Sequence, residues 1–388
     1  MKTATLTALL LASLLTSAAG PAWALSPEEE AAVQRGLDAL YVNDYAGAED
    51  VFRAALRSNA DSPVYALGVA VAAWWRLESR FAPPGSPEED AFRSALDRAL
   101  ETAKAAAAHD KSGEAQLYLA TGYGLRGRWR AANRRWLGAY LDGRRAYRGA
   151  EKALALDPEL YDAYLGLGAF NYYVATLSRV VRALAFARGG DREAGLRQLE
   201  LAAARGRFGR VAAKLVLVGI HWTFEKKPDA AWTLLEEVRR QYPGSPMLRA
   251  MRLLGLFHLR DAAGLEKEAR SFVESAKAGE PFFQPIDRAV GLCFLGLARQ
   301  LAADPAGALR EYAAGLGEVP PEHRWRSVFH LFTGEALDLL GRREEAVAAY
   351  KNALREPPLW GAHRYARHLL RRPFKPGDAP LPERHTAL

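Results

Sequence analysis

The most chemically distinctive stretch of the sequence runs from Arg128 to Arg148 and is crowded with arginine and aromatic residues. If Arg128 to Leu156 formed one uninterrupted helix, about twice the usual length, four rings would share one of its faces. These rings are Trp129, Trp136, Tyr140 and Tyr147. The arginines selected with them, from the other faces of that helix, are Arg130, Arg134, Arg144, Arg145 and Arg148.

This set of residues has two interpretations. Trp, Tyr and Arg concentrate binding energy at protein interfaces, so the set predicts an anchor for a partner. Alternatively, the rings form a buried seam against neighbouring helices and the arginines a solvated face. Anionic lipid or glycan head groups would use the same arginines.

No other arrangement of reactive residues fits a catalytic site. The eight histidines never stand four apart beside a glutamate, as they do in zinc proteases, and one cysteine cannot build a thiolate site. Cys293 lies in an apolar segment, which indicates a core thiol. Gly122 to Gly127 has the letters of a dinucleotide loop, but no strand precedes it, so these glycines are predicted to lie where helices pack. We expect no catalysis, no metal and no cofactor.

A recurring pattern of small and bulky residues indicates which elements would hold these side chains. A small residue precedes an alanine by 12 positions, and a bulky residue follows that alanine after 4 more. The pattern occurs as Gly36, Ala48 and Phe52, then Gly219, Ala231 and Leu235, then Gly296, Ala308 and Tyr312, then Gly334, Ala346 and Tyr350. This spacing is typical of the 34-residue helix pair of tetratricopeptide repeats (TPRs). The repeats would span about 29–62, 212–245, 289–322 and 327–360.

The predicted fold is therefore all-α: a right-handed α-solenoid of TPR-like helix pairs, with an elongated central helix and inserted helices. The solenoid would extend over residues 25–372. An apolar insertion at Ser178–Arg188 would form an extra helix, and residues 373–388, with four prolines, would form a disordered tail.

The central part resembles a narrower group. It contains the runs Tyr164-Leu-Gly-Leu-Gly-Ala-Phe-Asn-Tyr-Tyr, Gly190-Asp-Arg-Glu-Ala-Gly-Leu and Tyr242-Pro-Gly-Ser-Pro. These runs are similar to the inclusion-clearance and outer-mitochondrial-membrane TPR family, the tetratricopeptide repeat protein thirty-nine group, over roughly residues 113–353. The resemblance implies a helical superhelix with an adaptor role and no active-site motif.

Inward-facing positions of the first helices would line a groove. The groove residues we predict are Val216, Ile220, Phe224, Leu297 and Leu301. They are apolar, which disfavours a clamp for an acidic peptide terminus and indicates that something apolar fills the groove. We favour the chain's own Ser178–Arg188 segment; a partner's amphipathic helix or a lipid tail is the alternative.

The N-terminus predicts export. Met1 to Ala24 has a lysine, an apolar run and a final Ala22-Trp23-Ala24 box, so we expect a signal peptide cleaved after Ala24 and a periplasmic or secreted protein. No later run is long enough for a transmembrane anchor. The chain has a net charge of +8, but its arginines are interspersed with acids and nucleic-acid binding is not expected.

Together these features predict a non-catalytic, exported TPR scaffold or adaptor that binds a protein partner in the bacterial cell envelope, with lipid as a second candidate partner. The alternative is a carrier of an apolar ligand, a lipid or an amphipathic peptide, in the solenoid interior.

Overall fold

The computed structural model describes residues 25–79, 85–176 and 190–380, and every regular element in these ranges is a helix. The helices are α2 (Pro27–Tyr41), α3 (Tyr45–Ser58), α4 (Pro63–Ser79), α5 (Pro87–His109), α6 (Gly113–Ala132), α7 (Trp136–Leu156), α8 (Ala163–Thr176), α10 (Arg192–Arg205), α11 (Arg210–Ile220), the π-helix η1 (His221–Glu225), α12 (Pro228–Gln241), α13 (Pro246–His258), α14 (Ala262–Lys277), α15 (Pro285–Leu301), α16 (Pro305–Glu318), α17 (Trp325–Leu339), α18 (Arg343–Arg355) and α19 (Ala362–Arg371). The all-α prediction is confirmed. The expected signal segment, residues 1–24, and the expected inserted helix Ser178–Arg188 lie outside the described residues.

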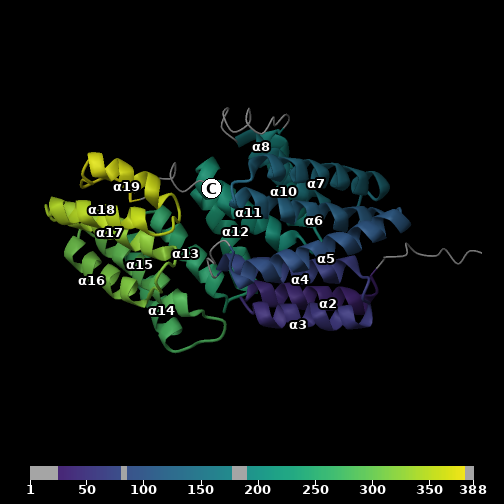
Figure 1. Cartoon of the computed structure of the whole chain (residues 1–388), viewed down its shortest axis with the longest axis horizontal. Coiled ribbons are helices and arrows are strands. Elements are labelled where there is room, and N and C mark those ends of the chain that lie inside the picture. Colours follow the sequence, from purple (N-terminus) through teal and green to yellow (C-terminus); the bar gives the residue numbers. More distant parts are fainter. Residues whose placement is uncertain (1–24, 80–84, 177–189, 381–388) are drawn as a thin grey trace, which may run out of the picture.

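Consecutive helices pack side by side as hairpins and stack into an elongated array (Figure 1). Helices α2 to α8 and α10 to α12 form one half of the molecule, and α14 to α19 form the other. Helix α13 lies between the two halves (Figure 1). Because each pair packs against the next, the array is a solenoid of helix pairs rather than one globular core.

The small and bulky residues of the repeat pattern pack against each other in the structure. A Cβ atom added to Gly334 would lie 2.3 Å from the Tyr350 ring, and one added to Gly296 would lie 2.3 Å from the Tyr312 ring. Each tyrosine is fully buried, so its ring occupies the space that the missing side chain leaves. Gly36 and Phe52 repeat the arrangement in the first pair. Gly219 does not, because nothing lies within 4 Å of its added Cβ.

The predicted long central helix is wrong. Helix α6 ends at Ala132 and α7 begins at Trp136, and Arg134 in the turn between them has a φ of 57°. A left-handed residue stops an α-helix and reverses the chain, and here it folds α7 back against α6. No proline or glycine marks this turn, Asn133-Arg134-Arg135, in the sequence.

The first helix pair also contacts the middle of the array. Tyr41, the last residue of α2, lies in one apolar cluster with residues of α11, α12 and α13, and its ring centroid is 5.3 Å from that of Tyr242. Asn43 accepts hydrogen bonds from the Ser245 hydroxyl and, at 3.4 Å, from the Met247 amide. The array therefore curves until its beginning packs against the connection between α12 and α13.

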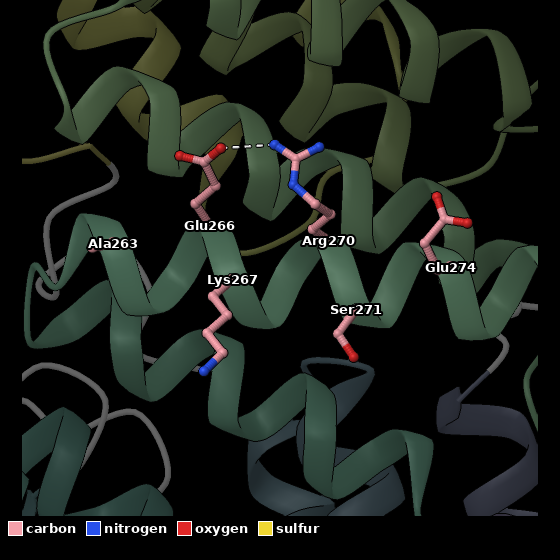
Figure 2. A pocket seen from close by; sticks show the side chains of 6 residues that line it. All are labelled: Ala263, Glu266, Lys267, Arg270, Ser271 and Glu274. Atoms are coloured by element: carbon pink, nitrogen blue, oxygen red, sulfur yellow. Dashed lines mark hydrogen bonds and ion pairs between the residues drawn. The ribbon is translucent and has the colours of Figure 1, made fainter.

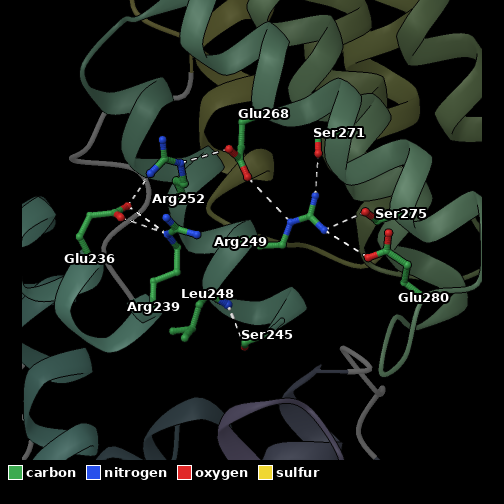
Figure 3. Close-up of polar contacts among 10 residues, drawn as sticks. All are labelled: Glu236, Arg239, Ser245, Leu248, Arg249, Arg252, Glu268, Ser271, Ser275 and Glu280. Carbon is green, nitrogen blue, oxygen red and sulfur yellow. Dashed lines mark hydrogen bonds and ion pairs between the residues drawn. The ribbon is translucent and has the colours of Figure 1, made fainter. Parts of the chain in front are cut away.

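An arginine network joins α12, α13 and α14 (Figure 3). Arg252 donates hydrogen bonds to Glu236 of α12 and Glu268 of α14. Arg249 donates to the hydroxyls of Ser271 and Ser275 in α14. These contacts attach the second half of the array to the first through α13.

The C-terminal segment departs from prediction. A disordered tail was expected from residue 373, yet Phe374 is buried and its amide donates a 2.9 Å hydrogen bond to Asp338 of α17. The Tyr365 hydroxyl donates to the Ala379 carbonyl. Proline content suggested disorder, but one phenylalanine and these hydrogen bonds hold residues 373–380 on α17 and α19; residues 381–388 lie outside the described residues.

Candidate functional site

A fully buried carboxylate, Asp142, organises the arginine-rich region. It accepts two hydrogen bonds from Arg126 of α6, at 2.8 and 2.9 Å. Arg130 of α6 and Arg145 of α7 donate to the same carboxylate at 2.5 and 2.8 Å. Three guanidinium groups from two helices thus converge on one acid and hold α6 against α7.

Electrostatics keep this acid ionised. Burial raises the pKa of the Asp142 carboxyl, but the hydrogen bonds and charge of Arg126, with those of Arg145 and Arg130, outweigh it and the pKa is lowered. The same contacts raise the pKa of Arg126. A charged buried group is tolerated only when paired in this way. Arg130 and Arg145 are thus bound within the protein, although the Arg145 side chain remains half exposed.

Three of the four predicted aromatic anchors belong to the helix packing. Trp129 lies on α6, not on α7; it is buried, and its indole N–H donates a 2.9 Å hydrogen bond to Glu89. Tyr140 is buried, and Tyr147 is partly buried with its ring centroid 5.1 Å from that of Phe170 in α8. The prediction that all four rings share one face of one helix is therefore wrong. Trp136, at the start of α7, is 37% exposed.

The exposed face of α7 carries two leucines that were not among the predicted site residues. Leu137 is 50% exposed and Leu141 is 43% exposed, and Arg144 and Arg148 continue the same row at helical spacing. We call Leu137, Leu141, Arg144 and Arg148 the α7 stripe. Their spacing, read from the sequence, is equally typical of a buried seam, so only the structure shows that this row is exposed.

The arginines around the α7 stripe have few acidic neighbours. Arg134, Arg144 and Arg148 are exposed and form no ion pair with the described residues. The Arg144 guanidinium lies 5.9 Å from the centre of the Tyr140 ring. Arg128, by contrast, forms a 2.8 Å ion pair with Glu78 of α4. Arg134, Arg144 and Arg148, with Trp136, are the predicted site residues that remain available to a partner.

The predicted groove residues do not form one open surface. Ile220 and Leu297 are buried in two different apolar clusters, because neighbouring helices pack directly on them. Val216, Phe224 and Leu301 are partly buried in the same clusters. The segment expected to fill a groove lies outside the described residues.

Two depressions on the surface have different linings. One is a shallow hollow of about 560 Å³ along the outer face of α14, lined by polar side chains such as Lys267 and Arg270 (Figure 2). The other, of about 220 Å³, lies among the start of α6 and the connections before α8 and before α11. Four carboxylates and two arginines line it, and Asp162 there accepts hydrogen bonds from the amides of Phe208 and Gly209.

Two further features concern metals and membranes. Among residues 25–79, 85–176 and 190–380, no three or more His, Cys, Asp or Glu side chains are grouped so that they could hold a metal ion. In the same ranges, no helix has the length and apolar character to cross a lipid bilayer. Cys293 is fully buried, as expected of a core thiol, and burial raises its pKa.

Comparisons with known proteins give only distant structural likenesses. No protein-family model matches the chain, and no curated protein matches it significantly. It is similar to a human IFIT1 dimer with m7Gppp-AAAA (13% identity, 90% of this chain and 86% of the other, TM-score 0.48) and to yeast Tom70 (12% identity, 88% and 89%, TM-score 0.43). It is also similar to a Rap protein complexed with competence and sporulation factor (12% identity, 84% and 76%, TM-score 0.40).

These likenesses are too weak to carry an argument about function, and none adds support to the narrower resemblance to the thirty-nine group. The recurring glycine–tyrosine packing and the stacked hairpins are observations on this chain itself. They show an all-α fold of stacked helix pairs, with a small–bulky spacing that is typical of tetratricopeptide repeats.

Proposed function

We propose that this protein is a non-catalytic scaffold, exported to the bacterial cell envelope, that binds a protein partner through the exposed face of α7. The observation that carries the proposal is the combination of Trp136, Leu137 and Leu141, three large apolar side chains that are all more than a third exposed. They adjoin arginines that form no ion pair with the described residues.

Physical chemistry supports a protein interface here. Leaving neighbouring apolar side chains in water is unfavourable by about 25 cal/mol for each Å² that a partner would cover. Trp and Arg are also enriched among the residues that dominate interface energy. The Asp142 cluster, which is Asp142 with Arg126, Arg130 and Arg145, holds α6 and α7 in one fixed orientation. A partner would therefore meet a surface that is already ordered.

The carrier alternative finds less support among the described residues. The smaller of the two depressions described above, about 220 Å³, is below the roughly 300 Å³ at which ligand pockets begin, and it is lined largely by charged side chains. The larger one is shallow and open, and charged residues of α14 line it. Neither resembles the enclosed apolar space that a lipid tail requires.

An affinity purification tests the proposal. The tagged full-length chain is isolated from envelope fractions, beside the variants Trp136→Ala and Arg144→Glu. We expect a stoichiometric protein partner with the native chain and loss of most of it with either variant. Arg310→Glu, an exposed arginine of α16, is the matched control and should retain the partner.

Two results would count against the proposal. Recovery of the same proteins with all variants would show that α7 is not the interface. Native mass spectrometry that finds lipid bound to the purified chain would favour the carrier instead. Export is tested separately: the protein from the envelope fraction should begin at Leu25, and a full-length N-terminus in the cytosolic fraction would contradict it.

A further inference from the structure

The α7 stripe has an internal order. Its two leucines occupy the first turns of α7, and its two arginines follow one to two turns later on the same row. From Leu137 to Arg148 the row is about 16 Å long at 1.5 Å per residue. The surface therefore changes from apolar to basic along the helix axis, over a length that three turns of a second helix would match.

The local charge is strongly one-sided. Residues 126–148 hold eight arginines against one acid, Asp142, a formal charge of +7 in a chain whose net charge is +8. Asp142 is enclosed by three of those arginines and presents no negative charge at the surface. The surface around α7 is therefore strongly basic, and an acidic ligand would be attracted to it.

From these observations we propose that the α7 stripe binds an acidic amphipathic helix of a protein partner, with the apolar end of that helix on Leu137 and Leu141 and its carboxylates on Arg144 and Arg148. The inference rests on the proposed scaffold function and specifies the chemistry of its partner. Helix packing in a groove or along a ridge is a common mode of peptide recognition, read at intervals of three and four residues.

Charge, symmetry and the distribution of apolar residues argue against three other occupants of the stripe. Residues 177–189 of the chain carry Arg179, Arg182 and Arg188 and no acid, so they would be repelled. A second copy related by twofold symmetry would place this stripe against itself. A membrane-surface helix has apolar residues along the whole of one face, whereas here only the first turns are apolar.

A peptide pair tests the order of the stripe. Two labelled helical peptides of identical composition, each about four turns long, carry two leucines and two glutamates on one face. In the patterned peptide the leucines occupy one end and the glutamates the other; in the mixed peptide they alternate. In fluorescence anisotropy with the full chain, the patterned peptide should bind at least about tenfold more tightly than the mixed peptide. Its affinity should fall at high salt, because salt screens the contacts between glutamate and arginine.

Single substitutions test which residues of the stripe contact the peptide. Each of three substitutions in the stripe should raise the Kd for the patterned peptide by about fivefold or more: Arg144→Glu, Arg148→Glu and Leu137→Ser. Arg310→Glu and Leu340→Ser, which change exposed residues in the second half of the array, should leave its affinity unchanged. Circular dichroism and thermal melting confirm that each variant is folded before its affinity is compared.

The possible failures are distinguishable. Equal binding of the two peptides, or no effect of the stripe variants, would overturn the inference. Binding of vesicles containing phosphatidylglycerol, without binding of the patterned peptide, would assign the surface to anionic membrane and overturn it too. If the envelope partner depends on Trp136 but the patterned peptide does not bind, the inference falls and the proposed function stands. If neither binds, both fall.

Discussion

The Tyr242 hydroxyl donates a 2.7 Å hydrogen bond to the carboxylate of Asp38, a residue 204 positions earlier in the chain. In a linear array of helix pairs, each pair contacts only its neighbours. Here the first pair also contacts the connection after α12, and the Tyr41 and Tyr242 rings pack beside the hydrogen bond. This contact makes the first half of the array a curved, closed unit.

Tyr242→Phe should remove that hydrogen bond and keep the ring packing. We expect the free energy of unfolding to fall by about 1–2 kcal/mol, because a partly buried hydrogen bond to a carboxylate is lost. Urea denaturation followed by circular dichroism measures the change. A variant as stable as the native chain would show that the closure depends on the rings alone.

Asp142→Ala should be among the most destabilising single substitutions in the chain. It leaves the partly buried Arg126 and Arg130 without their counter-ion. Breaking a fully buried ion pair costs about 3–5 kcal/mol, and because these arginines are partly exposed we expect a loss at or below the lower end of that range. Asp90→Ala, at an exposed position of α5, is the control and should change stability little. If the two variants melt at the same temperature, the Asp142 cluster does not hold α6 and α7 together.

The Asp142 cluster also predicts the acid behaviour of the protein. Its carboxyl pKa is below the ordinary 3.8, so its contribution to stability is complete above that value and is lost as the pH falls through the lower folded pKa. Stability measured from pH 5 to pH 2 should therefore fall less steeply for Asp142→Asn than for the native chain. Equal slopes would contradict the assignment.

Asp287, at the start of α15, predicts an opposite trend at higher pH. Burial raises its pKa from 3.8 to about 6, so the folded chain holds this proton more tightly than the unfolded chain does. Its ionisation should destabilise the fold as the pH rises from about 4 to about 6, by on the order of 1–2 kcal/mol. Asp287→Asn still accepts the hydrogen bond from the Gln284 amide and should remove this decline. A native-like pH profile in the variant would assign the effect to another group.

Gly334→Ala tests the repeat rule. The new methyl group would lie 2.3 Å from the buried Tyr350 ring, so the ring or the helices must move, and we expect destabilisation of about 1–3 kcal/mol. Gly166→Ala in α8 meets nothing within 4 Å and should be neutral or stabilising by up to about 1 kcal/mol. A neutral Gly334→Ala would show that the tyrosine pocket adapts to the extra methyl group.

The sequence predicts the hairpins where their packing is local. Gly296 and Tyr312 stand 16 residues apart on the two helices of one pair, so the repeat spacing alone indicates their contact. The turn at Arg134 was not predictable, because any residue can be forced into a left-handed conformation when the helices on either side pack well. The Asp38–Tyr242 contact depends on the accumulated curvature of many pairs, which no short pattern specifies.

The candidate site, too, was only partly predictable from the sequence. Its residue types were predictable, because arginine and tryptophan in the region of residues 128–148 indicate binding. Their exposure was not, because it depends on the neighbouring helices. Trp129 is buried beside Phe92 of α5 and Tyr140 beside Phe170 of α8, whereas Leu137 and Leu141 stay exposed. Asp142 stood among the arginines as the single acid, and that signal could have identified it as their common partner.

The contact of the first helix pair with α12 and α13 has a consequence during synthesis. The ribosome completes Tyr41 and Trp75 early, but their covering residues Tyr242 and Leu248 are made some 200 residues later. At 5–20 residues per second this delay lasts roughly 10–40 s. Throughout that interval the nascent chain lacks the residues that cover this aromatic surface, so the first helix pair reaches its final packing only after α12 and the start of α13 have been made.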